Sequence, residues 1–163
     1  MKIGLYDPYL ETLGGGEKYF LTVLETAVKT PGVEVTLFAP THPDTRQWKR
    51  LGIQVPQTSF SFKKTDELTL ARHSQGLDRL FVMHNGIPPE SRAKRSIAMI
   101  QFPFQQLSLS RKRDWLRPVQ STWQRVKQLH QLRSYDTFLC NSKFTEEWLV
   151  KRFGVSPLIA PPP

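Results

Sequence analysis

The chain opens with short apolar runs separated by an amphipathic segment. Residues 2–6 (KIGLY) form an apolar run that ends at Asp7-Pro8, which predicts a buried strand. The segment after Gly14-Gly15-Gly16 predicts a helix whose core-facing stripe holds apolar residues at helical spacing, namely Phe20, Leu21, Leu24, Ala27 and Val28. Pro31-Gly32 ends this helix, and residues 33–39 (VEVTLFA) predict the next strand. A strand, a helix and a strand in this order predict parallel pairing through a right-handed crossover.

The same alternation continues to the end of the chain. Further strands are expected at 53–55 (a weak one), 78–84, 96–101, 136–140 and 157–160. Helices are expected at 44–51, at 66–75, in a segment that ends near residue 133, and at 142–153, where Gly154 closes the helix. Residues 60–65 (FSFKKT) favour neither state. Six or seven short strands alternating with helices predict an α/β, Rossmann-like fold with a doubly wound, mainly parallel sheet.

Length and composition fit one globular domain. The chain has 163 residues, of which 39% are hydrophobic and 23% charged, as in ordinary folded domains. No apolar run approaches the roughly 18 residues that a membrane span requires. The single cysteine, Cys140, lies in the apolar run TFLC, which favours a small core residue over a redox group. One free cysteine also fits a reducing, cytoplasmic location.

The formal net charge of +9 calls for a polyanionic partner, and its distribution narrows the choice. Zinc-ligand spacings and RNA-recognition aromatic motifs do not occur in the sequence, so we expect no nucleic acid. Between residues 111 and 133 there are seven basic residues against one acid, Asp114. A basic cluster with an aromatic residue suits an anionic membrane surface. We therefore predict a peripheral membrane or anion patch formed by Arg111, Lys112, Arg113, Trp115 and Arg117. The alternative for this region is an ordinary domain helix, with its apolar stripe in the core and its charges in water.

The triglycine Gly14-Gly15-Gly16 lies between the first strand and the first helix. Glycines let a ligand approach the backbone and allow unusual dihedral angles, and a helix N-terminus attracts phosphate. The spacing is neither GxGxxG nor GxxxxGK[ST], so the signatures of dinucleotide and P-loop sites are missing. The pattern predicts a phosphate-approaching turn, with a plain structural turn as the alternative.

Three segments together resemble a known family. DPYLETLGGGEKYFLTVLE resembles the opening of the GT-B fold glycosyltransferases of family 4. YDTFLCNSKFTEEWLVKRFGVSPLIAPPP resembles the end of that family's N-terminal domain, and AKRSIAMIQFPF resembles its fifth strand and following loop. The likeness is to the mannosyltransferases that extend lipid-linked oligosaccharides and to related bacterial enzymes.

This resemblance implies the N-terminal, acceptor-binding domain of a retaining glycosyltransferase. Such an enzyme transfers a sugar from a nucleotide-sugar donor to a lipid-linked or membrane-proximal acceptor, using neither metal nor cofactor beyond the nucleotide-sugar co-substrate. Residues 1–160 would form the acceptor-side domain, and 161–163 would begin the inter-domain linker. The nucleotide-sugar domain, which makes most donor contacts, would be absent, so the chain alone is expected to be inactive.

The resemblance also implies site residues. Those for the donor phosphate or transferred sugar are Gly14, Gly15, Gly16, Glu17, Asn141, Ser142 and Thr145. The helix dipole alone also favours a carboxylate at Glu17, and we weigh helix capping above ligand binding for Ser142.

Two further positions are candidates for the chemistry itself. Gln101 stands where the family often has a histidine near the transferred sugar; it can hydrogen-bond a hydroxyl but cannot titrate. His84, at a strand end, is a weaker catalytic candidate with a structural role as the alternative. For the whole chain, the alternative function is a non-catalytic Rossmann-like module that binds a partner protein or phosphorylated ligand. A nucleic-acid-binding α/β protein, suggested by charge alone, is a third.

Overall fold

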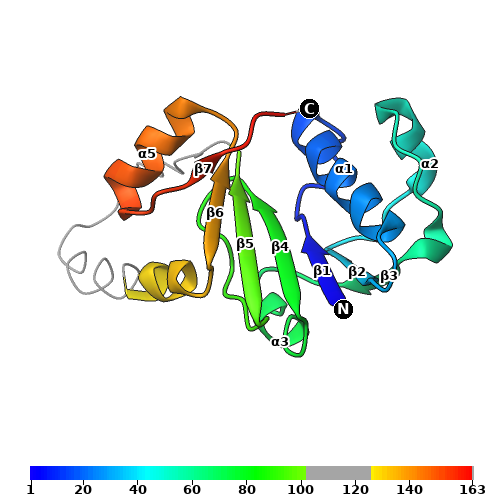
Figure 1. Cartoon of the computed structure of the whole chain (residues 1–163), viewed down its shortest axis with the longest axis horizontal. Helices are drawn as coiled ribbons and strands as arrows, with labels where there is room; N and C mark the ends of the chain where they lie inside the picture. The colour runs from blue at the N-terminus through cyan, green and yellow to red at the C-terminus, as the bar shows by residue number, and fades with distance from the viewer. Residues whose placement is uncertain (102–125, 163) are drawn as a thin grey trace, which may run out of the picture.

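A seven-stranded parallel sheet organises the protein (Figure 1). We describe it from a computed structural model, in which residues 1–101 and 126–162 are described. The strands are β1 (Lys2–Tyr6), β2 (Glu34–Ala39), β3 (Ser61–Lys64), β4 (Arg79–His84), β5 (Arg95–Ile100), β6 (Thr137–Cys140) and β7 (Leu158–Ile159). Their order across the sheet is β3-β2-β1-β4-β5-β6-β7, and every neighbouring pair is parallel. This arrangement confirms the predicted Rossmann-like α/β fold.

Helices connect the strands and cover the sheet. They are α1 (Gly15–Lys29), α2 (Thr45–Trp48), α3 (Leu70–His73) and α5 (Lys143–Phe153), with residues 126–133 also helical. Two 3-10 turns, η1 (Lys49–Leu51) and η2 (Gln57–Ser59), follow α2. The helix predicted at 44–51 is therefore α2 continued by η1, with Asp44 as its N-cap. Gly154, in the left-handed region at φ 67°, ends α5 as expected.

Two predictions about this part of the chain need correction. The weak strand at 53–55 does not form: Ile53 and Val55 are buried, but the Ile53 N–H donates to the Trp48 carbonyl at 3.2 Å instead of pairing with a strand. The neighbouring strand β3 forms within the ambiguous segment 60–65. The helix expected at 66–75 shortens to α3, because Asp66 Oδ1 accepts the Thr69 N–H at 2.9 Å and holds a turn before it.

The core divides into two layers, one on each face of the sheet. On one face, α1 and α2 contribute Phe20, Leu21, Leu24 and Trp48, which pack over strand residues such as Leu5. The other face carries α3, the 126–133 helix and α5, which pack against residues such as Tyr6, Val82 and Cys140. Figure 1 shows α1 and α2 at one end of the molecule and α5 at the other. The predicted stripe on α1 is confirmed, since Phe20, Leu21 and Leu24 are fully buried.

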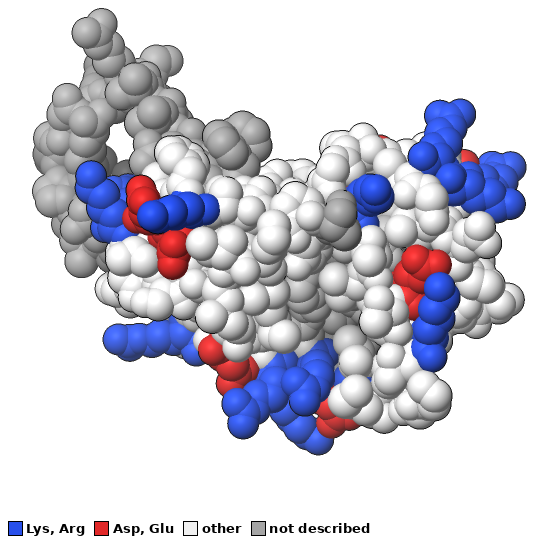
Figure 2. Space-filling view, turned by 45° about the horizontal axis from the view of Figure 1, so that its top comes forward, with Lys and Arg blue, Asp and Glu red and all other residues white. Residues whose placement is uncertain are grey.

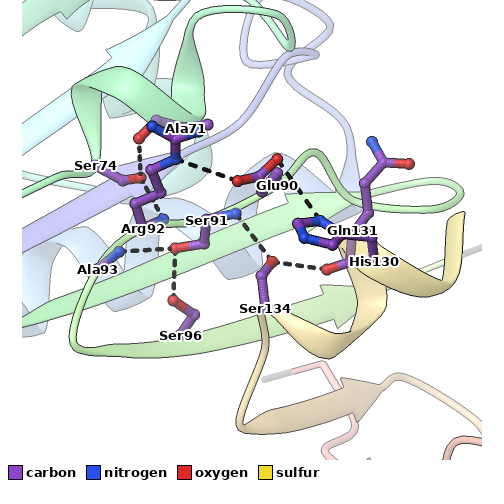
Figure 3. Close-up of polar contacts among 10 residues, drawn as sticks. All are labelled: Ala71, Ser74, Glu90, Ser91, Arg92, Ala93, Ser96, His130, Gln131 and Ser134. Carbon is purple, nitrogen blue, oxygen red and sulfur yellow. Dashed lines mark hydrogen bonds and ion pairs between the residues drawn. The ribbon is translucent and has the colours of Figure 1, made fainter. Parts of the chain in front are cut away.

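The crossover from β4 to β5 is a loop, since residues 85–94 form neither helix nor strand. Ser91 anchors it (Figure 3): its Oγ lies 2.6 Å from Ser96 Oγ and accepts the Ala93 N–H at 3.2 Å. The Ser91 N–H donates to Ser134 Oγ at 3.0 Å, which ties the loop to the end of the 126–133 helix. Side-chain hydrogen bonds thus replace the backbone bonds that a crossover helix would make.

Candidate functional site

The strand order reverses between β1 and β4. From β1 the chain winds outward through β2 and β3, and it then returns across the sheet so that β4 pairs with the other side of β1. In open α/β sheets, ligands bind outside the carboxyl ends of the strands at this reversal. The loop that leads into α1 begins here, and so does the loop that follows His84.

The triglycine lies at this point, but its backbone differs from expectation. Gly14 is the N-cap of α1 with φ −86°, and Gly14, Gly15 and Gly16 are absent from the residues with positive φ. The expectation that these glycines supply an unusual dihedral angle is therefore wrong. Leu13, with φ 51°, takes the left-handed conformation instead. For a leucine this conformation is unfavourable by about 1–2 kcal/mol, so the strain falls just before the helix.

Gly16 packs against a side chain that follows β5. A Cβ at Gly16 would overlap the side-chain amide of Gln101, which follows β5, so the amide rests directly on the first turn of α1. At Gly15 a Cβ would have open space within 4 Å, and this residue is exposed. The structure thus joins two candidates that the sequence placed on separate motifs, and it leaves the Gly15 backbone accessible.

The Glu17 side chain hydrogen-bonds back to the backbone at the start of the glycine turn. Its Oε2 accepts the Gly14 N–H at 2.6 Å, and the residue is only 7% exposed. A carboxylate in the first turn also complements the positive end of the helix dipole. Glu17 therefore shapes the glycine loop through one of its two carboxylate oxygens.

His84 ends β4 with both ring nitrogens engaged. Its Nδ1 accepts the Gly86 N–H at 3.1 Å, which leaves the proton of the neutral ring on Nε2, 3.1 Å from Glu67 Oε1. Tyr9 packs against the ring with a centroid separation of 5.9 Å. The pKa of Glu67 lies below its usual value because of this hydrogen bond. Sequence reasoning missed Tyr9 and Glu67, since only the folded loops bring them to His84.

Asp7 was also missed, although it directly follows the first predicted strand. It is fully buried, its Oδ1 accepts the Tyr9 N–H at 2.8 Å, and its Oδ2 has no hydrogen-bond partner among the described residues. Burial raises its pKa from 3.8 to about 7, the hydrogen bond from the Tyr9 N–H opposes this shift, and the Glu17 charge adds to it. Strongly perturbed carboxyls gather at functional sites, which supports this location.

The polar residues that follow β6 hydrogen-bond to one another and to the residue after β5, and they do not form an open site. Ser142 is the N-cap of α5 and accepts the Thr145 N–H at 3.3 Å, which confirms the capping interpretation. Thr145 is 1% exposed, and its Oγ1 lies 3.1 Å from Asn141 Oδ1 and 3.3 Å from the Gln101 carbonyl oxygen. Thr145 therefore holds the residue after β5 in place and does not itself face a ligand.

The predicted basic patch, Arg111, Lys112, Arg113, Trp115 and Arg117, lies outside the described residues. In the described part, Figure 2 shows lysines and arginines in separate groups beside acidic residues. Examples are the exposed ion pairs Lys94–Asp78 at 2.7 Å and Arg46–Asp44 at 3.0 Å. In residues 1–101 and 126–162, the helices are all too short or too polar to cross a bilayer.

The single cysteine of the sequence is a core residue. Cys140 is fully buried in the second core layer, and burial raises the pKa of its thiol, as expected for a core residue. The described ranges contain no group of three or more His, Cys, Asp or Glu side chains placed to hold a metal ion.

The chain matches no known protein-family model, and it matches no curated protein sequence.

Proposed function

We propose that this chain is the acceptor-side half of a retaining glycosyltransferase that uses a nucleotide-sugar donor and a lipid-linked or membrane-proximal acceptor. In this proposal the nucleotide-sugar domain comes from polypeptide outside these 163 residues. The observation that carries the proposal is the contact of the Gln101 amide with Gly16, at the sheet's strand-order reversal. Its two members belong to two of the segments that resemble glycosyltransferase family 4.

The first turn of α1 offers what a leaving phosphate needs. The N–H groups of Gly15 and Gly16 lie where a helix has no carbonyl of its own to accept them. Together with the helix dipole they would stabilise the negative charge that develops on the departing phosphate. At Gly15, which is exposed and has open space where a side chain would lie, the donor could approach the backbone closely.

Gln101 would orient the transferred sugar and not move a proton. Its amide can donate to one hydroxyl and accept from another, but it does not titrate. In the proposed reaction the acceptor hydroxyl attacks the anomeric carbon, the bond to the phosphate breaks, and the hydroxyl proton passes to the leaving phosphate oxygen. Both ring nitrogens of His84 already have partners, Gly86 and Glu67, so the His84–Glu67 pair would shape the floor of the site.

A peripheral membrane location is the second part of the proposal. Residues Arg111, Lys112, Arg113 and Arg117 supply positive charge, and Trp115 supplies an interfacial ring. A membrane-held enzyme would meet a lipid-linked acceptor at its own surface.

Amide NMR of the 163-residue chain titrated with GDP-mannose and UDP-glucose tests the donor-facing part. We expect shifts at Gly14, Gly15, Gly16 and the Gln101 side-chain amide, with weak affinity because one side of the cleft is present. The same titration with NAD should leave these resonances unchanged, since the GxGxxG signature is missing.

The matched variant is Gly16→Ala, compared with Gly15→Ala. A methyl group at Gly16 would displace the Gln101 amide, whereas at Gly15 it meets open space. We expect Gly16→Ala to abolish the shift at Gln101, while Gly15→Ala keeps it. Shifts with inorganic phosphate that equal those with nucleotide sugars would instead favour a general phosphate-binding module.

A further inference from the structure

We propose that the hollow between the loops after β1 and β2 binds one neutral, hydroxyl-rich sugar ring of the acceptor. This inference rests on the proposed glycosyltransferase function and names where the acceptor would lie. The hollow has a volume of about 180 Å³ and is lined by residues of the two loops and of α2: Leu10, Glu11, Leu13, Thr41, His42, Pro43, Asp44, Gln47 and Trp48.

The position of the hollow fits an acceptor site. Both loops leave the carboxyl ends of neighbouring parallel strands, so the hollow opens on the same edge as the glycine turn. Leu13, which lines it, directly precedes Gly14. A ligand seated here would therefore lie beside the first turn of α1, where the proposed transfer takes place.

The volume of the hollow fits a ligand the size of one sugar ring. A cavity of about 150 Å³ holds one benzene molecule, and the present volume is slightly larger at about 180 Å³. Dinucleotides and drug-sized ligands occupy roughly 300 Å³ or more. One six-membered sugar ring is the class of ligand that this space admits.

The lining matches the two kinds of surface on a sugar. Leu10 and Trp48 are 3% and 1% exposed, and together with the buried Pro43 they give an apolar base for the C–H face of a ring. Trp48 is held by stacking on Phe60 at 5.9 Å. Around this base, Thr41 and Gln47 offer an exposed hydroxyl and an exposed amide for the ring hydroxyls.

The charge of the lining disfavours an anion. Its charged residues are Glu11 and Asp44, and the described lining contains neither Lys nor Arg. The Arg46 side chain hydrogen-bonds Asp44 at 3.0 Å and holds the pKa of that carboxyl below its usual value, so Asp44 is ionised at neutral pH. Arg46 compensates part of the Asp44 charge, so Glu11 supplies most of the repulsion toward a phosphate, and hydroxyl groups can donate to both carboxylates. The hollow is therefore suited to a neutral sugar and not to a sugar phosphate.

The His42 ring forms a wall of this hollow and also lines a neighbouring one, which includes Thr45, Arg46 and Gln57. Its Nδ1 lies 3.1 Å from the Pro43 carbonyl oxygen, and its ring meets Phe62 edge-on with centroids 4.6 Å apart. These contacts hold the ring without a ligand, so the wall is formed before binding. Such preorganisation reduces the entropy lost when a ligand enters.

The test is an amide NMR titration of the 163-residue chain with methyl α-D-glucopyranoside and methyl α-D-mannopyranoside. We expect the Trp48 indole N–H and the backbone of Thr41 and His42 to shift, while the Trp148 indole in α5 does not. Glucose 6-phosphate should bind at least about tenfold more weakly. A Gln47→Ala change should weaken binding of the methyl glycosides about three- to tenfold, the effect of one neutral hydrogen bond.

Gln75→Ala is the matched control, because Gln75 is an exposed glutamine in the turn after α3; it should bind as wild type does. Unshifted Trp48, equal binding by Gln47→Ala, or tighter binding of glucose 6-phosphate would each overturn the inference. If the glycine turn responds to nucleotide sugars while Trp48 ignores the glycosides, only the acceptor site is wrong. If neither the glycine turn nor Trp48 shifts, the proposed function is wrong as well.

Discussion

Replacing Asp7 by asparagine tests the electrostatics at the carboxyl end of β1. The folded protein holds this carboxyl fully buried, with its pKa raised to about 7, while in the unfolded chain it titrates near 3.8. Between these values the folded state binds more protons than the unfolded state. Stability therefore falls as the pH rises from about 4 to about 7, and it levels off above that. Asparagine keeps the shape and the acceptor for the Tyr9 N–H but does not titrate.

The magnitude follows from the displaced pKa. A tenfold change in acid dissociation corresponds to about 1.4 kcal/mol, so ionised Asp7 destabilises the folded state by about 4 kcal/mol. Between pH 5 and pH 8 this group removes about 2–3 kcal/mol, by the same conversion. Burying the asparagine amide costs about 1–3 kcal/mol, because its NH2 group would stand in place of Oδ2, which has no hydrogen-bond partner among the described residues. At pH 5, where about 1–2 kcal/mol is already lost, the variant should be about as stable as wild type, and at pH 8 it should be more stable than wild type.

Urea unfolding of both proteins at pH 5, 6, 7 and 8 measures this directly. Other titrating groups contribute to both curves, so the difference between Asp7→Asn and wild type isolates Asp7. We expect the difference to move in favour of the variant by about 2–3 kcal/mol across the series. A difference that stays constant with pH would show that Asp7 is ionised throughout, and the reasoning about its burial would be refuted.

Two more predictions concern the patch and the end of β6. Changing Arg111, Lys112 and Arg113 to alanine together should weaken binding to phosphatidylserine vesicles by about 3 kcal/mol, at about 1 kcal/mol per basic residue; unchanged flotation would contradict a membrane role. Ser142→Ala should lower the free energy of unfolding by about 1 kcal/mol through loss of the α5 N-cap, while Ser142→Asp should retain most of it. Equal urea midpoints for Ser142→Ala and wild type would argue against capping.

Most strands could be predicted because their side chains are apolar on both faces. Residues of β4 and β5 are buried on either side of the sheet, so the signal is a continuous apolar run. The edge strand β3 lacks that signal, since three of its four residues are exposed. The apolar residues Ile53 and Val55 gave a false strand signal, because a loop buried against the core has apolar residues as a buried strand does.

The site was predictable as a set of segments but not as contacts. Strand ends and glycines indicated Gly16, His84 and Gln101 separately. Their meeting depends on the strand order, in which β4 separates β1 from β5, and on an amide that reaches across to α1. The raised pKa of Asp7 arises from packing, which a linear pattern does not carry.

The measurement that bears most directly on the central claim is the Gln101 side-chain amide resonance during titration with GDP-mannose and UDP-glucose. The account predicts a shift with at least one of these donors, no shift with NAD, and loss of the response in Gly16→Ala. If the Gln101 resonance does not move with either donor while the chain stays folded, the assignment of the Gly16–Gln101 region to sugar transfer is contradicted.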